Sequence, residues 1–302
     1  MNLQGIFPAL TTPFAADGSV ALDKLRDNVA RYNATGLAGY VVIGSTGESV
    51  LLSFDEIEHI WAAVRESAAP GKLLIAGTGV ETTAETIARS RRAASLGYDA
   101  VLVKTPHYYK SLLTPTALEQ HYRRVADASS VPVLIYSIPQ YTGIAVTAEW
   151  VARLADHPNI VGIKDSSGNA QLVAEILHYC PKEFRTFVGS ASTLLASLTL
   201  GGAGGVLALS CFLPEATVEL YEAYRAGNMQ RASQVQHSLL VPSRKIAGEF
   251  GPTGTKYAMD CVGYYGGDPR LPLLPLTDAQ KAGIQAVLAS VVPAATAGSA
   301  VR

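Results

Sequence analysis

Short apolar runs alternate with helix-like stretches along almost the whole chain. The apolar runs are nearly continuous, which is typical of strands buried on both faces. Between them, Ser53-x-x-Glu56 and Thr82-x-x-Glu85 match the capping box that begins a helix, and Thr114-Pro115 places a proline in a first helical turn. The pattern predicts repeated strand–helix units with a parallel sheet. The predicted strands are 5–13, 39–45, 72–78, 100–106, 131–139, 159–166, 185–190 and 204–210.

Eight such units predict a (β/α)8 barrel of the α/β class, whose active site lies at the C-terminal ends of the strands. The alternative, a doubly wound open sheet, usually has a glycine-rich first turn, and the first turn here, TTPFAADGS, is not glycine-rich. After residue 213 only helical patterns remain, more than an eighth barrel helix needs. We therefore expect a barrel over 1–225, a C-terminal helical extension of the same domain over 226–292, and a frayed tail over 293–302.

The composition narrows the class of protein. Hydrophobic residues make up 48% of the 302 residues, charged residues 16%, and the formal net charge is -1. This balance favours a large core and gives no reason to expect nucleic acid or a membrane as a partner. The three cysteines are not close in sequence, the N-terminal residues do not resemble a signal peptide, and no apolar run is long enough to span a membrane. We expect a cytoplasmic protein.

A lysine ends the apolar run IVGIK, at Lys164. A lysine is seldom fully buried unless it is paired or reactive. One interpretation is a structural ion pair with Asp165 or Glu48. The other is an amine nucleophile that forms a Schiff base with a carbonyl substrate, because burial favours the free amine. Lys104 ends another apolar run, and position alone does not choose between the two lysines.

The other strand ends supply hydroxyl groups. Tyr136 ends VPVLIY and is either a packing residue or a proton carrier beside an amine. The turn GSTGE, residues 44–48, is either a plain connection or a nest of N–H groups for a carboxylate. The six histidines lack metal-ligand spacing, so we expect no catalytic metal, and no Ser-His-Asp arrangement is convincing.

Five motifs occur in order at barrel spacing: GSTGE, TPHYY, YSIPQYTG, GIKDSSG and GSAS. Together they resemble the dihydrodipicolinate synthase / N-acetylneuraminate lyase family of class I, Schiff-base aldolases, over about residues 3–290. Several stretches, including YSIPQYTG and MDCVGYYGGDPRLPLLPL, are most similar to 4-hydroxy-2-oxoglutarate aldolase. The resemblance implies a 2-oxo acid substrate such as pyruvate, no metal or organic cofactor, and a homotetramer built as a dimer of dimers.

The resemblance also implies a role for individual residues. Lys164 matches the Schiff-base lysine, and Lys104 has no family role. Tyr136 matches the tyrosine that transfers protons around the imine. Ser45 and Tyr108 match its relay partners, with Tyr108 reaching into a neighbouring subunit's site. Thr46, with Ser45 beside it, matches the residue that binds the pyruvate carboxylate. Leu207 matches the residue that contacts pyruvate through its backbone.

Two positions bear on the second substrate. Tyr141 stands where dihydrodipicolinate synthases have an arginine that grips a carboxylate, and a tyrosine cannot replace that bidentate clamp. By resemblance, Ser166 contacts the carboxylate of a glyoxylate part. We predict a pyruvate-dependent aldolase that cleaves 4-hydroxy-2-oxoglutarate to pyruvate and glyoxylate. The alternatives are a dihydrodipicolinate synthase that joins pyruvate to aspartate semialdehyde, a sugar-acid aldolase or dehydratase, and a non-catalytic 2-oxo acid sensor.

Overall fold

The computed structural model describes residues 2–291, so the predicted tail over 293–302 lies outside the described residues. The chain divides into two compact units. The first joins Leu73–Val206 to the N-terminal residues through Gly5, and the second joins Ile6–Lys72 to the chain from Leu207 onward. Each unit is described by itself below, and the predicted bounds of the barrel and its C-terminal extension stay a prediction.

The first unit is built on parallel strands that are almost entirely buried. Each strand pairs with the next along the chain, as repeated strand–helix units require. The pairing places Lys104 opposite Tyr136 and Tyr136 opposite Lys164, so three predicted site residues share one level of the sheet. The strands are β3 (Leu73–Gly77), β4 (Ala100–Lys104), β5 (Val133–Ser137), β6 (Ile160–Asp165), β7 (Arg185–Val188) and β8 (Gly204–Leu207), whose last residue is in the second unit.

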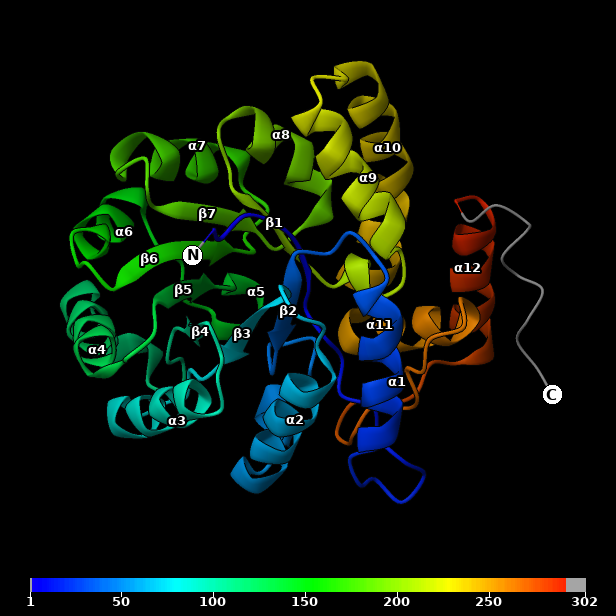
Figure 1. The fold of residues 1–302 in the computed structure, drawn as a ribbon, viewed down its shortest axis with the longest axis horizontal. Coiled ribbons are helices and arrows are strands. Elements are labelled where there is room, and N and C mark those ends of the chain that lie inside the picture. The colour runs from blue at the N-terminus through cyan, green and yellow to red at the C-terminus, as the bar shows by residue number, and fades with distance from the viewer. Residues whose placement is uncertain (1, 292–302) are drawn as a thin grey trace. The chain divides into compact units, whose positions relative to one another are not determined.

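Helices cover the outer side of these strands, and Figure 1 shows α3, α4, α6 and α7 in that position beside β4–β7. Their starts follow the sequence signals: Thr82 accepts the N–H of Glu85, and Thr114 accepts the N–H of Ala117. The helical segments are α3 (Thr83–Ser95), η2 (Lys110–Leu112), α4 (Pro115–Ala128), α5 (Pro139–Thr142), α6 (Ala148–Ala155), α7 (Ala170–Tyr179), η3 (Ala191–Thr193) and α8 (Leu194–Thr199).

The second unit holds β1 (Gly5–Pro8), whose first residue is in the first unit, β2 (Gly39–Val42) and the C-terminal helices. Ser53 forms both bonds of the predicted capping box with Glu56. Gly251, at φ 54°, interrupts the helix that contains it. The helical segments are α1 (Leu22–Asn33), η1 (Ser49–Leu51), α2 (Phe54–Ser67), η4 (Leu209–Cys211), α9 (Pro214–Arg225), α10 (Met229–Pro242), the π-helix η5 (Ser243–Gly248), α11 (Glu249–Cys261) and α12 (Asp278–Ala289).

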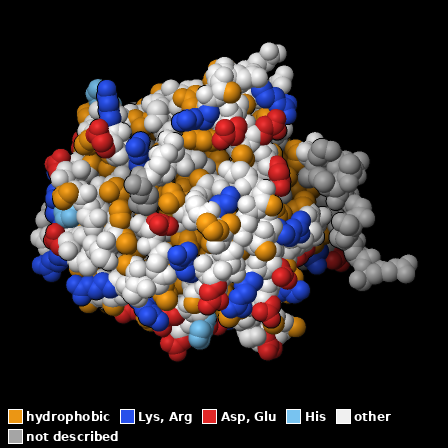
Figure 2. All heavy atoms as spheres, in the orientation of Figure 1, with side chains coloured by type: hydrophobic (Ala, Val, Ile, Leu, Met, Phe, Trp, Pro, Cys, Tyr) orange, Lys and Arg blue, Asp and Glu red, His pale blue; other side chains and the backbone are white. Residues whose placement is uncertain are grey.

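The strands form one eight-stranded sheet in the order β1-β8-β7-β6-β5-β4-β3-β2. A parallel bridge between Ala9 and Val41 joins the two ends of this order. The fold is the predicted (β/α)8 barrel, and helices follow it toward the C-terminus. Among residues 2–291, no helix is long and apolar enough to cross a membrane. On the face drawn in Figure 2, acidic and basic side chains are interspersed with apolar ones.

Several strands are shorter than predicted, because their apolar runs continue into buried turns. β2 ends at Val42 rather than at residue 45, since Ile43 adopts a left-handed conformation at φ 64°. β1 and β8 end at Pro8 and Leu207, and the buried residues that follow them are not strand. The turns at the C-terminal ends of the strands therefore contain more of the chain than the pattern predicted.

Candidate active site

Lys164 and Tyr136 lie side by side on β6 and β5. Their side chains are almost completely buried, at 4% and 3% exposure. The Lys164 Nζ atom lies 4.3 Å from the centroid of the Tyr136 ring. Burial favours the neutral form of an amine, which is the nucleophilic one. The structure therefore brings a buried amine and a tyrosine ring together at neighbouring strand ends.

Glu48, which the sequence offered as an ion-pair partner for Lys164, is paired with another lysine. The Glu48 carboxylate bonds to Lys256 instead, at 2.7 Å between Nζ and Oε1, and both side chains are fully buried. Asp165 Oδ2 accepts bonds from the hydroxyl and the N–H of Ser167, at 2.5 and 3.2 Å. Burial raises the pKa of Asp165, while those bonds and one from Ser137 oppose the shift.

Lys104, the competing lysine, has a carboxylate beside it. Its Nζ atom lies 3.8 Å from Glu81 Oε1 and 3.4 Å from His107 Nδ1. Burial lowers the pKa of Lys104, and the charge of Glu81 opposes the shift. Lys104 therefore belongs to a charged cluster, whereas Lys164 lies against an aromatic ring.

Gly189, directly after β7, makes room for both Lys164 and Ser166. A Cβ atom on Gly189 would lie 1.9 Å from Ser166 Oγ and 3.2 Å from Lys164 Cε. Ser166 is also held through its backbone, because its N–H donates to the Ser137 carbonyl and its own carbonyl accepts from the Gln140 side chain. The structure thus brings the Ser166 hydroxyl close to the Lys164 side chain. The sequence placed Gly189 at a strand end without indicating this role, and it gave no sign of Gln140.

Tyr141 and Tyr108 are the exposed aromatic residues of the predicted set. The Tyr141 side chain is 56% exposed, yet burial near its hydroxyl and the proximity of Tyr136 raise its pKa. The place of Tyr141 in the site stays a prediction. Tyr108 is 75% exposed, and its ring packs edge-on against Tyr109 at 5.0 Å between centroids.

The second unit supplies the GSTGE turn, with Ser45 and Thr46 partly buried. The turn is tightly shaped: Glu48 has φ 56°, and a Cβ on Gly47 would lie 2.9 Å from the Leu10 carbonyl oxygen. The Thr12 hydroxyl donates to the Gly47 carbonyl at 2.7 Å. The N–H groups of Gly47 and Glu48 already donate to the Gly44 and Ser45 carbonyls within the turn, so the carboxylate nest predicted for GSTGE cannot rely on these two groups.

Leu207, the last residue of β8, is fully buried. Its carbonyl accepts the N–H of Ala9 at 3.1 Å. A carbonyl oxygen has two lone pairs, so this bond leaves the oxygen capable of one further contact. The backbone contact predicted for Leu207 stays a prediction.

A buried network links the GSTGE turn to the C-terminal helices, and sequence analysis missed it. Lys256 Nζ on α11 bonds to Glu48 Oε1 and, at 2.8 Å, to the Asp268 carbonyl. The other Glu48 oxygen accepts the N–H of Arg270 at 2.9 Å. The guanidinium of Arg270 in turn pairs with Glu56. No motif or periodicity in the sequence pointed to this network.

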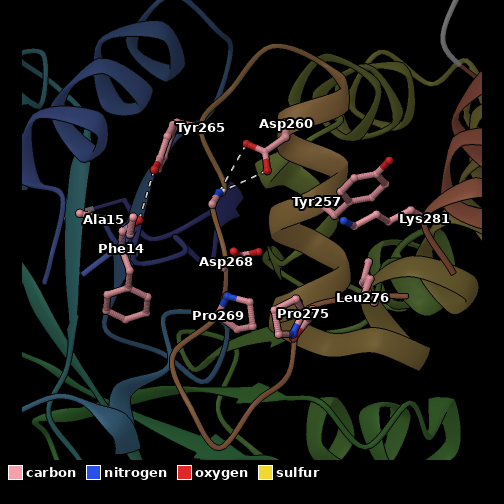
Figure 3. A pocket seen from close by; sticks show the side chains of 13 residues that line it. Phe14, Ala15, Tyr257, Asp260, Tyr265, Asp268, Pro269, Pro275, Leu276 and Lys281 are labelled. Carbon is pink, nitrogen blue, oxygen red and sulfur yellow. Dashed lines mark hydrogen bonds between the residues drawn. The ribbon is translucent and has the colours of Figure 1, made fainter. Parts of the chain in front are cut away.

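The second unit also contains a cavity of about 340 Å³ between Phe14 and α11 (Figure 3). Its Asp260 carboxylate already accepts the N–H groups of Gly266 and Gly267. The residues that line it do not include the predicted site residues. Among residues 2–291, no group of three or more histidine, cysteine or acidic side chains is arranged to hold a metal ion.

A (β/α)8 barrel with a buried lysine and a tyrosine at neighbouring strand ends defines a Schiff-base-forming lyase. The family described as "Dihydrodipicolinate synthetase family" matches residues 2–291. The chain belongs to this family, as its motifs predicted.

Relatives and solved structures agree with this assignment. Proteins named 4-hydroxy-tetrahydrodipicolinate synthase from Methanothrix thermoacetophila and Listeria welshimeri are both 37% identical; the first match covers 94% of this chain and 96% of the relative, the second 95% and 98%. The Bacillus anthracis dihydrodipicolinate synthase structure has a TM-score of 0.92 at 29% identity, covering 97% of this chain and 100% of that one. A pyruvate complex of an E. coli K12 prophage protein of the same family has a TM-score of 0.91 at 27% identity, with 96% and 99% covered.

Proposed function

We propose that the protein is a pyruvate-dependent aldolase in which Lys164 forms the Schiff base. The observation that carries this proposal is the contact between the buried Lys164 amine and the Tyr136 ring. The amine attacks C2 of a 2-oxo acid. Tyr136 passes a proton to the departing carbinolamine hydroxyl, with Ser45 and Tyr108 as relay partners, and water leaves as the iminium forms.

The iminium then accepts the electron pair of the breaking bond. In the cleavage direction, the 4-hydroxyl of the substrate loses its proton, the C3–C4 bond breaks, and the aldehyde departs. The enamine left on Lys164 is protonated at C3 and hydrolysed, which frees pyruvate. Thr46 and Ser45 hold the carboxylate and Leu207 contacts pyruvate through its backbone; such positioning contributes several kcal/mol to catalysis, on the order of 7–11 at best.

We propose 4-hydroxy-2-oxoglutarate as the substrate, cleaved to pyruvate and glyoxylate. Tyr141 supports this assignment, because it stands near Tyr136 where a synthase of this family would have a guanidinium. Ser166 supports it too, since its hydroxyl lies near the Lys164 side chain beside Gly189, and a hydroxyl can donate a hydrogen bond to a small carboxylate.

The second candidate is the synthase reaction, in which the same enamine attacks aspartate semialdehyde. The names of the relatives favour it, because the full-length matches are called 4-hydroxy-tetrahydrodipicolinate synthase. The two reactions share the pyruvate imine and differ in the aldehyde that reacts with it. An aldolase or dehydratase that acts on a 2-oxo sugar acid would also begin with an imine on Lys164.

The test has two stages. Borohydride reduction with pyruvate, read by intact mass and peptide mapping, should give one adduct on Lys164 that disappears in Lys164→Ala; an adduct on Lys104 would contradict the mechanism. Pyruvate release from 4-hydroxy-2-oxoglutarate is then compared with condensation of pyruvate and aspartate semialdehyde. Turnover of the semialdehyde alone would establish the synthase, and an adduct without turnover of any aldehyde would indicate a sensor.

We also propose a cytoplasmic homotetramer built as a dimer of dimers. All three cysteines are free, which suits a reducing compartment. The exposed Tyr108 ring suits a residue that completes a neighbouring subunit's site. Sedimentation velocity would show the oligomer, and a monomer with full activity would contradict the role of Tyr108 between subunits.

A further inference from the structure

The loop that carries Tyr108 is anchored by a single carboxylate, that of Glu81. Glu81 Oε2 accepts the backbone N–H of His107 at 3.0 Å and that of Tyr108 at 2.9 Å. Glu81 follows β3, and the two N–H groups follow β4. One side chain therefore ties the ends of two neighbouring strands together at the residue expected to relay protons.

Two basic side chains lie beside the other oxygen of the same carboxylate. Glu81 Oε1 lies 2.8 Å from His107 Nδ1 and 3.8 Å from Lys104 Nζ. Burial acts to raise the pKa of Glu81, but the N–H groups of Tyr108 and His107 and the side chains of His107 and Lys104 together lower it. The carboxylate is thus charged at neutral pH, and hydrogen bonds to a charged acceptor are stronger than neutral ones.

Among the described residues, the Tyr108 side chain has little packing to fix its position. The hydrogen bond of its backbone N–H group to Glu81 therefore positions it. The Tyr108 and Tyr109 rings are 75% and 67% exposed and contact each other edge-on. Gly79 allows the anchor to come close, since a Cβ there would lie 2.4 Å from the Lys104 backbone nitrogen. The end of β3 therefore passes directly against the end of β4, and Glu81 lies two residues further on.

We propose that Glu81 is a positioning residue that sets the place of Tyr108, while the side chains of Lys104 and His107 hold its other carboxylate oxygen. This inference rests on the proposed function, in which the Tyr108 hydroxyl relays protons for the imine on Lys164. It also gives Lys104 a role: the second strand-end lysine keeps the anchoring carboxylate charged and oriented.

The test measures exchange of the pyruvate methyl protons for deuterium in D2O by proton NMR, which requires the imine and the enamine but no aldehyde. Glu81→Ala removes the acceptor and should slow exchange about tenfold or more, since small displacements of a catalytic group have effects of this size. Glu81→Gln keeps an acceptor for the two N–H groups and should restore most of the rate. Glu85→Gln is the matched control, because that carboxylate pairs with Arg89 on the surface of α3 and should leave exchange unchanged.

A double-mutant cycle separates positioning from a general loss of structure. If Glu81 acts through Tyr108, then Glu81→Ala should slow exchange little further once Tyr108→Phe has removed the hydroxyl. Independent, multiplying effects would overturn the proposal, as would full activity in Glu81→Ala. If Tyr108→Phe alone has no effect while Lys164 still forms the pyruvate adduct, the relay and this positioning role are both wrong, but the Schiff-base function stands. Thermal unfolding of each variant shows whether a slow variant is folded.

Discussion

Removing the amine of Lys256 should destabilise the protein strongly, although the residue is not expected to touch substrate. Lys256 and Glu48 are both fully buried and lie 2.7 Å apart. Burial lowers the pKa of Lys256, and the Glu48 charge opposes that shift. In Lys256→Met the Glu48 carboxylate stays buried without its cation, and the Asp268 carbonyl loses a donor. Breaking a buried pair in this way costs about 3–5 kcal/mol of unfolding free energy.

The assay is urea unfolding of wild type, Lys256→Met and the double variant Glu48→Gln/Lys256→Met. The double variant should recover much of the loss, because it removes the uncompensated charge as well. Lys245→Met is the matched control: Lys245 pairs with Glu249 on the surface, so its loss should cost about 0–1 kcal/mol. A loss below about 1 kcal/mol in Lys256→Met would refute the reasoning, since a buried charge would then have been left unpaired at little cost.

The same network should also affect the reaction. Glu48 belongs to the GSTGE turn and has the left-handed conformation that a non-glycine residue adopts only under constraint. In the double variant the turn loses its bond to Lys256 on α11, but no unpaired carboxylate is left in the core. We expect weaker pyruvate binding than in wild type, measured by the concentration dependence of borohydride trapping. Unchanged binding would show that the turn holds its shape without Lys256.

Three further outcomes are expected. Tyr136→Phe should slow formation of the borohydride-trapped pyruvate adduct about 100-fold or more, as loss of a proton carrier does, and an adduct formed at the wild-type rate would contradict its role. Gly189→Ala should reduce kcat/KM for the cleaved substrate about tenfold or more while pyruvate is still trapped, because the added Cβ displaces Ser166 before it meets Lys164; unchanged kcat/KM would show that Ser166 does not contact the substrate. His121 is buried and its pKa is lowered from 6.5 to about 4 by burial, so its contribution to stability is present above pH 6.5 and is lost as pH falls toward 4. Urea unfolding should show about 2 kcal/mol of this loss at pH 5, and His121→Gln should show a correspondingly smaller pH dependence; equal slopes would contradict the shift.

The barrel could be predicted from sequence because burial on both faces makes each strand a nearly continuous apolar run. The residues at which the strands end could not be predicted, because an apolar side chain indicates burial and does not indicate backbone conformation. Ile43 is as buried as the strand before it, yet its φ of 64° ends the strand. Leu209 and Cys211 are equally buried in a short helix. Turns packed against a core therefore look like strand in a hydrophobicity pattern.

The site residues that sequence analysis found lie on the strands or in named motifs, and those it missed act across the chain. The Glu81–Tyr108 bond joins residues 27 apart, and the Lys256–Glu48 bond joins residues 208 apart. Periodicity describes only neighbours, so no pattern in the chain marks such pairs. The family resemblance did not indicate these pairs either, because its motifs mark residues expected to contact substrate.

The partner of each buried lysine resolves the ambiguity that the sequence left. Lys104 and Lys164 both end apolar runs, and position along the chain does not choose between them, while Lys256 is a further buried lysine on α11. Lys104 faces Glu81 and Lys256 faces Glu48, so each has a carboxylate that favours its charged form. Lys164 faces the ring of Tyr136, at the same level of the sheet. A carboxylate stabilises an ammonium, whereas a tyrosine can also exchange a proton with a carbinolamine. The contact with Tyr136, and not burial alone, therefore supports the proposal that Lys164 is the nucleophile.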